Sequence, residues 1–327
     1  MKSFMGVDGG GTKTLAVLIS ERGKLLGYAE GGPTNYAERG REEVIEELLK
    51  AINKASGGYH ISSLCVGLAG LARSEELSEM NEILSRLNLA DRSEATSDGL
   101  IALYAATRGK PGLVLISGTG SIAWGMDEAR NVIRADGWGY LLGDRGSGFD
   151  IGRSGMVAAF QAYDGRGMDT TLLPAMLEHF SVSSPEQLIR IIYGRRELAI
   201  PMIAGFAPTV IAEAKKGDKV AAEIVEEACA QLSLSAKAVM GKLSVSLSCV
   251  YVAGSLFKDQ FFRSIVEKKL GTRLLSSPLS PVMGAVIRAA QNVGFYPNED
   301  FFSKLSLADK RLASLKGSGG EGKTRTG

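Results

Sequence analysis

The chain has 327 residues, of which 45% are hydrophobic and 23% are charged, and its formal net charge is +2. This composition is ordinary for a globular protein, and the length predicts about two domains. The charges are spread along the chain without a basic stripe, so nucleic-acid binding is not predicted. No apolar stretch approaches a membrane span, and the first predicted strand begins at Phe4, which leaves no room for a signal peptide.

The first predicted elements are a meander of three strands followed by alternating helices and strands. Strands are expected at 4–7, 15–20, 25–29, 64–70 (ending in a glycine turn) and 93–97, and helices at 41–55, at 74–87 with Ser74 as the cap, and at 99–108. The helix predictions rest on apolar residues at helical spacing, such as Val44, Leu48 and Ile52. Adjacent strands mixed with helical crossovers indicate an α/β protein.

The pattern restarts after residues 109–112. Strands are expected at 113–116, 121–126, 131–135 and 249–253, a long helical region from about 150 to 241, and helices from about 258 to 270 and from 280 to about 292. Because both halves begin with the same meander, we interpret the chain as a duplication with a helical insertion in the second half. The glycine-rich tail, 316–327, is expected to be flexible.

Two glycine-rich turns, at 8–14 and at 117–121, are the most informative features. Their sequences are Asp8-Gly9-Gly10-Gly11-Thr12-Lys13-Thr14 and Ser117-Gly118-Thr119-Gly120-Ser121, and each lies between two apolar runs. Glycine lets backbone amides approach an anion closely, and hydroxyl groups add donors. An ordinary hairpin needs only one or two glycines. The pair of turns therefore predicts binding of a polyphosphate from two sides.

Two common nucleotide motifs do not explain these turns. Counting a Walker loop from Gly6 puts the lysine one place late, and strand-like sequence follows where a helix is required. The segment 118–123 matches G-x-G-x-x-A, with Asp136 and Asp144 downstream, but a strand again follows. A Rossmann turn must open a helix, so this interpretation is disfavoured.

The cysteines and histidines do not indicate a metal centre or a nucleophile triad. Cys65, Cys229 and Cys249 are widely spaced in apolar sequence, which is typical of buried free thiols in a reducing cytoplasm. His60 and His179 have no neighbours with metal-ligand spacing.

Seven segments, in order, resemble the N-acetylglucosamine kinase group of the BadF/BadG/BcrA/BcrD-type ATPase family, within the actin/hexokinase/Hsp70 superfamily. They span roughly the first 290 residues and lie at 6–14, 32–35, 67–70, 97–99, 117–121, 137–147 and 252–255. The resemblance implies a duplicated actin-like (ribonuclease H-like) fold of two lobes, each with a mixed five-stranded sheet and flanking helices, and a cleft between them. The expected lobes are 1–110, joined by a C-terminal helix at about 286–312, and 111–285.

The resemblance implies that ATP and Mg²⁺ are the cofactors. Asp8 is expected to bind Mg²⁺ through water. The residues expected to contact the nucleotide are Asp8, Gly10, Gly11, Thr12, Lys13, Thr119, Gly120, Gly254 and Ser255. Two alternatives stay open: Lys13 as a solvated strand residue, and Gly254-Ser255 as an ordinary strand-to-helix turn.

The same resemblance implies a sugar acceptor, with Asp98 as the general base for its 6-hydroxyl. A structural alternative is that Asp98 caps the helix that follows it, and both roles can coexist. The residues expected to bind the sugar are Asn35, Asp98, Gly120, Ser121, Trp138 and Asp144. Asn35 and Asp144 can make paired hydrogen bonds to hydroxyls, and the glycines beside Trp138 favour presentation of its ring to a sugar face.

Several alternatives remain beside this sugar kinase hypothesis. Ile122 occupies a position where an asparagine is expected in eukaryotic N-acetylglucosamine kinases, so a glucosamine kinase or a broad-specificity hexokinase fits as well. An ATPase activator of a 2-hydroxyacyl-CoA dehydratase or benzoyl-CoA reductase type enzyme would need paired cysteines for its iron–sulfur cluster. A sugar-sensing protein that does not phosphorylate would not need Asp98. A cytoplasmic homodimer is the expected assembly.

Overall fold

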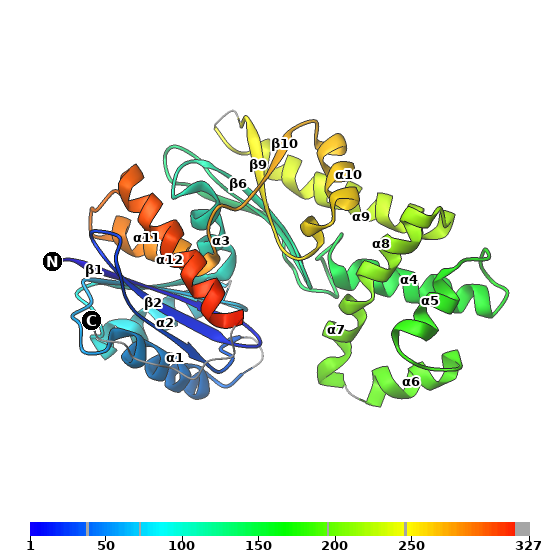
Figure 1. The fold of residues 1–327 in the computed structure, drawn as a ribbon, viewed down its shortest axis with the longest axis horizontal. Helices are drawn as coiled ribbons and strands as arrows, with labels where there is room; N and C mark the ends of the chain where they lie inside the picture. The colour runs from blue at the N-terminus through cyan, green and yellow to red at the C-terminus, as the bar shows by residue number, and fades with distance from the viewer. Residues whose placement is uncertain (37–38, 72, 195, 245–246, 318–327) are drawn as a thin grey trace. The chain divides into compact units, whose positions relative to one another are not determined.

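The computed structural model describes residues 1–36, 39–71, 73–194, 196–244 and 247–317. The chain divides into two compact units, Met1–Lys110 with Ser277–Gly327, and Pro111–Ser276. They are called unit 1 and unit 2 (Figure 1).

Unit 1 is built on a mixed five-stranded sheet. Its strands are β1 (Ser3–Gly9), β2 (Thr14–Ser20), β3 (Leu25–Gly31), β4 (Ser63–Leu68) and β5 (Ser93–Ser97), in the spatial order β3-β2-β1-β4-β5. The meander pairs are antiparallel, whereas β1, β4 and β5 run parallel. Parallel strands need a crossover, and helices supply it here.

Helices cover both faces of this sheet. They are α1 (Arg41–Ser56), α2 (Ser74–Leu87), α3 (Asp98–Thr107), α11 (Pro281–Asn292) and α12 (Glu299–Gly317). Met5 and Val7 of β1 pack in one core with α1 and α2. Because side chains alternate along a strand, Phe4, Gly6 and Asp8 point to the other face. There α11 crosses β1, and a Cβ on Gly6 would lie 2.5 Å from the Val282 carbonyl oxygen.

Unit 2 repeats the same sheet topology. Its strands are β6 (Gly112–Ser117), β7 (Ser121–Met126), β8 (Val132–Asp136), β9 (Cys249–Ala253) and β10 (Arg273–Ser276), in the order β8-β7-β6-β9-β10. β6–β7 and β7–β8 are antiparallel, and β6–β9 and β9–β10 are parallel, as for the corresponding strands of unit 1. The predicted duplication, with a mixed five-stranded sheet in each half, is confirmed.

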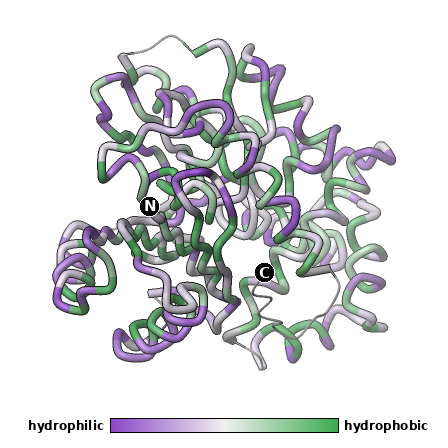
Figure 2. Tube along the Cα trace, turned by 60° about the vertical axis from the view of Figure 1, so that its left-hand side comes forward, coloured by the Kyte–Doolittle hydropathy of each residue, from purple (hydrophilic) through white to green (hydrophobic). Residues whose placement is uncertain are grey.

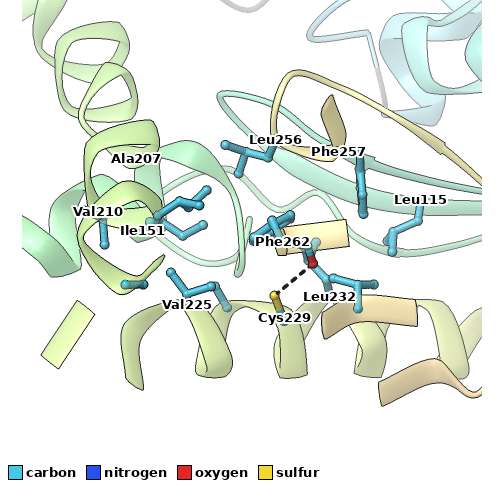
Figure 3. Close-up of a cluster of buried hydrophobic side chains, with 14 of the residues drawn as sticks. Leu115, Ile151, Ala207, Val210, Val225, Cys229, Leu232, Leu256, Phe257 and Phe262 are labelled. Atoms are coloured by element: carbon cyan, nitrogen blue, oxygen red, sulfur yellow. Dashed lines mark hydrogen bonds between the residues drawn. The ribbon is translucent and has the colours of Figure 1, made fainter. Parts of the chain in front are cut away.

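The helical insertion of unit 2 lies between β8 and β9. It consists of α4 (Gly148–Tyr163), α5 (Leu172–His179), α6 (Pro185–Gly194), α7 (Arg196–Gly205), α8 (Ala207–Lys216) and α9 (Lys219–Met240), and the 3₁₀ turn η1 (Leu256–Lys258) and α10 (Gln260–Leu270) follow β9. Apolar residues of these helices and of β6 form one core (Figure 3). Cys229 lies within it, and its thiol donates to the Phe262 carbonyl at 3.8 Å.

Four expectations differ from the structure. The C-terminal helix expected at about 286–312 is two helices, because Gly294 has a φ of 71° and Pro297 follows it. Strand β10 was not expected, because its four residues are too few to show a periodic pattern. The N-cap of α2 is Arg73 rather than Ser74. Cys65 and Cys229 are buried free thiols, but Cys249 is only half-buried. The tail residues 318–327 lie outside the described residues.

One segment of the described residues, 198–216, is long and apolar enough to cross a membrane by length and composition alone. In the structure it comprises most of α7 and all of α8, with Phe206 between them. Phe206, Val210 and Ile211 are buried in the core of unit 2, and 33% of the apolar stretch is buried. Figure 2 shows that the helices carry both hydrophobic and hydrophilic residues along their length, as expected when one side faces a core.

Candidate functional site

In unit 1 the predicted residues gather at one edge of the sheet. The parallel pairing aligns Gly9 with Leu68 and Leu68 with Ser97, so the carboxyl ends of β1, β4 and β5 are level. Asp8 is the next-to-last residue of β1, and Asp98 directly follows Ser97, the last residue of β5. Because neighbouring strands are about 4.8 Å apart, Gly9 and Ser97 are separated by roughly 10 Å across the sheet. This is the edge at which α/β proteins bind ligands.

The first glycine turn is a tight hairpin with an exposed tip. Gly10 N–H donates to the Lys13 carbonyl at 2.9 Å, and Gly11, Thr12 and Lys13 are exposed. The side chain of Lys13 lies 3.6 Å from that of Glu30 on β3, and both are about half exposed. This ion pair is the arrangement expected of a solvated strand residue, and surface pairs of this kind are weak.

The loop after β3 packs directly onto this turn. Thr34 N–H donates to the Gly10 carbonyl, and a Cβ on Gly9 would lie 2.2 Å from the Thr34 hydroxyl. The Thr34 and Thr14 hydroxyls are 2.7 Å apart in the interior. Asn35, the next residue, is therefore held close to the first glycine turn by its neighbour, and Tyr36 N–H donates to the Ala69 carbonyl.

Asp98 is the first residue of α3, and the helix cap is Ser97. The Ser97 hydroxyl accepts from Leu100 N–H at 3.2 Å, and the Asp98 carboxylate accepts from Gly99 N–H at 2.8 Å. The side chain reaches solvent, yet the protein atoms around it remove hydration and raise the pKa of Asp98 above its usual range. Because Ser97 is the N-cap of α3, the alternative in which Asp98 has that role is wrong.

The second glycine turn, in unit 2, is fixed by the start of α4. Gly148 N–H donates to the Gly118 carbonyl at 2.7 Å, and Phe149 N–H donates to the Thr119 carbonyl at 3.2 Å. A Cβ on Gly118 would meet no atom within 4 Å, so the turn is open on that side. Thr119 is exposed and Gly118 and Gly120 are half-buried, and backbone amides and a hydroxyl on such a turn are suited to an anionic ligand.

Gly254 lies against this same turn. Its φ is 100°, and a Cβ there would lie 2.1 Å from the Ser117 carbonyl oxygen. Ser255 is exposed and begins η1 without a side-chain capping bond. The structure thus brings Gly254 next to Ser117 and Gly118, although an ordinary turn would also use a glycine with positive φ.

Asp144 and the second turn are also in contact. A Cβ on Gly120 would lie 2.8 Å from an Asp144 carboxylate oxygen, and the carboxylate accepts hydrogen bonds from Ser121 and Gly139 N–H. Burial, and then the neighbouring Asp136 carboxylate, raise the pKa of Asp144 to about 6. The Ser121 hydroxyl is buried and donates to the Arg145 carbonyl, so it holds the loop in place.

Asp136 organises the loop between β8 and α4, and we did not predict this role. Its carboxylate accepts from Gly137 and Asp144 N–H, both at 2.8 Å, and from Arg145 N–H at 3.1 Å. These bonds close the loop at its base. The signal was an Asp-Gly pair at a strand end, eight residues before Asp144, which favours an aspartate that binds backbone amides.

Trp138 lies on this loop with 65% of its surface exposed. The predicted presentation of the ring is therefore observed, but the Arg134 guanidinium stacks on it, 4.6 Å from the ring centroid. Tyr140, Leu141 and Leu142 beside it are exposed as well.

A cavity of about 230 Å³ is lined by Arg145 and by residues of α4 and α9, among them Asp150, and by none of the predicted site residues. Within the described ranges, no group of three or more His, Cys, Asp or Glu side chains could hold a metal ion. Asp8 carries a carboxylate, which is the kind of hard oxygen ligand that Mg²⁺ prefers.

Comparison with known proteins identifies a family and several relatives. The BadF/BadG/BcrA/BcrD ATPase family matches residues 5–289. The chain is 32% identical over 302 residues to an N-acetylmuramic acid/N-acetylglucosamine kinase of Clostridium acetobutylicum, covering 88% of this chain and 98% of that protein. It is 27% identical to an N-acetyl-D-glucosamine kinase of Dictyostelium discoideum, covering 88% and 97%.

A solved structure supports the fold. A candidate N-acetylglucosamine kinase from Chromobacterium violaceum has a TM-score of 0.72 and 26% identity, covering 88% of this chain and 98% of that one. The duplicated actin-like fold that the sequence predicts is confirmed by this likeness and by the matching topology of the two sheets.

Proposed function

Because the chain belongs to the BadF/BadG/BcrA/BcrD ATPase family, we propose that it is an ATP-dependent kinase that phosphorylates the 6-hydroxyl of an amino sugar or hexose. The acceptors we expect are N-acetylglucosamine, glucosamine or glucose, and the first of these is in the names of both relatives. The observation that carries the proposal is the alignment of Gly9 and Ser97, which supports a phosphate turn and a carboxylate acting at one sheet edge.

Asp98 is the proposed general base. Phosphoryl transfer needs a positioned hydroxyl, neutralised phosphate charge and a group that accepts the hydroxyl proton. Asp98 begins a helix, its carboxylate is held by Gly99 N–H, and its pKa is raised by loss of hydration. A general base is most effective when its pKa lies near the pH at which the enzyme operates, and a raised pKa brings a carboxylate closer to that pH.

The two glycine turns are the proposed nucleotide-binding elements. When bound, ATP would supply the phosphoryl group and Mg²⁺ would neutralise charge on the phosphates. Asp8 would hold the ion through water, and the first turn would bind phosphate with Gly10, Gly11, Thr12 and Lys13. Thr119 and Gly120 would bind phosphate from unit 2, and Gly254 with Ser255 would contact the adenosine. Lys13 would have to leave Glu30, which is a small cost for a half-exposed pair.

The proposed acceptor residues come from both units. Asn35 and Asp144 would bind sugar hydroxyls, Asp144 most strongly when it is ionised. Gly120 and Ser121 would contribute mainly backbone, because the Ser121 hydroxyl is already bonded to Arg145. Trp138 would offer the ring face opposite Arg134.

A substrate panel tests the activity. Purified protein with Mg-ATP is assayed on N-acetylglucosamine, glucosamine, glucose, mannose and N-acetylmuramic acid, the last because of the Clostridium relative. Formation of a 6-phosphate on an amino sugar would support the proposal, and equal rates on glucose and mannose would indicate a broad-specificity hexokinase. No phosphorylation of any sugar would refute it.

The variant Asp98→Asn tests the base. We expect kcat to fall by about 10²- to 10⁴-fold, because the amide cannot accept the proton, while sugar affinity measured by calorimetry stays within a few fold. The control is Asp91→Asn, an exposed residue near the opposite end of β5, which should leave kcat unchanged. A near-normal rate in Asp98→Asn would rule out this role.

We further propose that the protein works in the cytoplasm as a homodimer. The buried free thiols of Cys65 and Cys229 favour a reducing compartment. Light scattering coupled to size-exclusion chromatography measures the assembly directly.

A further inference from the structure

A buried ionic network connects three elements of unit 1 and is not explained by the proposed chemistry so far. Arg288 of α11 makes a two-pronged bond to Glu94 of β5, with Nε–Oε2 at 2.9 Å and Nη2–Oε1 at 2.7 Å. Its remaining nitrogen donates to the hydroxyl of Tyr104 on α3, and Asn292 donates to Glu94. Both charged side chains are about three-quarters buried.

The network spans the two elements that meet at Asp98. β5 ends at Ser97 and α3 begins at Asp98 with no loop between them. Glu94 lies four residues before Asp98, and Tyr104 lies six residues after it. Arg288 therefore links β5 to α3 through Glu94 and Tyr104. We call the junction of these two elements, at Ser97 and Asp98, the corner.

Helix α11 is itself fixed closely to its neighbours. A Cβ on Gly284 would lie 1.9 Å from the Ile101 carbonyl oxygen of α3, so the two helices touch through their backbones. Gly6 of β1 allows the same close approach to Val282 and Val286. Arg288 follows Gly284 by one helical turn, so it extends from an element that already contacts both β1 and α3.

The Glu94–Arg288 pair is suited to fixing the relative position of the two elements that it joins. Burial alone would raise the pKa of Glu94, but the hydrogen bonds and charge of Arg288 hold it below its usual range. Apolar residues of similar volume are often as stabilising as such a buried pair. What the two-pronged bond adds is a fixed distance and orientation between its partners.

We propose that Glu94 and Arg288 are positioning residues that set the angle between β5 and α3 and thereby hold Asp98 in place for the reaction. The inference rests on the proposed function, because the position of Asp98 matters for turnover only if Asp98 acts on the substrate. The Asp98 carboxylate itself touches neither residue of the pair, so the effect passes through the backbone of the corner.

Kinetics of Glu94→Gln and Arg288→Lys test the positioning. Each variant keeps the size of the side chain but breaks the two-pronged ionic bond. We expect kcat to fall about 10- to 100-fold with the sugar KM within about threefold, because small misplacement of a reacting group has effects of this size. Sugar affinity is measured in parallel to separate binding from turnover.

Two controls separate positioning from loss of stability. Met80→Ala removes a buried side chain from the other face of the unit 1 sheet and is assayed well below its melting temperature. Glu299→Gln breaks the exposed ion pair of Glu299 with Arg108, the residue that follows the C-terminal end of the same helix α3. Both should keep kcat within about twofold of the unmodified protein.

Hydrogen exchange gives a readout that does not depend on activity. Amides in peptides covering 95–103 should exchange faster in Glu94→Gln than in Met80→Ala. Unchanged exchange would overturn the proposal, and so would faster exchange with normal kcat. If the unmodified protein phosphorylates no sugar, the proposed function and the catalytic part of this inference both fail, while the exchange still decides whether the pair holds the corner.

Discussion

At the scale of single residues, the clearest electrostatic feature is the aspartate pair at the base of the β8–α4 loop. Asp136 binds three backbone amides, whereas Asp144 is partly buried, lies beside Asp136 and has a pKa raised to about 6. A carboxylate that is more easily protonated in the folded than in the unfolded state destabilises the fold when it is ionised. A carboxylate with a strongly shifted pKa is a candidate functional residue.

The variant Asp144→Asn should therefore stabilise the protein without sugar at pH 8. The rise of the pKa from 3.8 to about 6 corresponds to about 3 kcal/mol at most, and partial exposure reduces the expected gain to about 1–2 kcal/mol. The gain is full above pH 6 and disappears as the pH falls toward 3.8. Urea unfolding at pH 8 and pH 5 measures it, and equal gains at both would contradict the assignment.

The pH dependence of sugar binding should follow the same carboxyl group. Below about pH 6 Asp144 takes up a proton and loses acceptor capacity, so the sugar KM should rise as the pH falls. Asp136→Asn removes the neighbouring charge, which lowers the pKa of Asp144 and moves this rise to lower pH. The control is Asp164→Asn, an exposed aspartate just after α4 that should leave the profile in place. A profile that is the same in Asp136→Asn would exclude coupling between the two carboxylates.

At the scale of elements, local patterns decide what the sequence can predict. Both glycine turns and the strands beside them follow from apolar runs broken by Gly, Ser and Thr, and the structure has them at the expected places. Strand β10 could not be predicted, because four residues with two leucines have no period and depend on pairing with β9. The contacts of Glu94 with Arg288 and of Gly254 with Ser117 are equally invisible, because they join residues far apart in the chain.

Gly254→Ala tests whether the turn after β9 is a close-contact element. Its φ of 100° and the 2.1 Å approach to the Ser117 carbonyl oxygen predict a loss of about 3 kcal/mol or more, from strain plus overpacking. Gly271→Ala is the matched control: φ is 65° at the end of α10, with no atom within 4 Å, so only the conformational loss of about 1–2 kcal/mol is expected. Denaturant unfolding compares them. Equal losses would show that the contact with Ser117 is unimportant.

At the scale of the whole molecule, the duplication is asymmetric in how the chain completes each unit. Unit 2 is one continuous segment, 111–276, and its core is formed from that segment alone. Unit 1 needs two segments, because α11 and α12 return to cover the sheet made by residues 1–110. Phe295, after α11, packs on Phe4 of β1 with ring centroids 5.1 Å apart.

Fragments of the chain should show this asymmetry. The fragment 111–276 should fold by itself, with a cooperative thermal transition and a helical circular dichroism spectrum, because its size and core are those of an independent domain. The fragment 1–110 should not, since the face of β1 and β2 that contacts α11 would be left in water. Adding the peptide 277–317 to it should restore a cooperative transition, whereas the same peptide with Gly284→Leu should not, because the close contact with α3 has no room for a side chain. Cooperative folding of 1–110 alone would show that the returning helices are an accessory to unit 1 rather than part of its core.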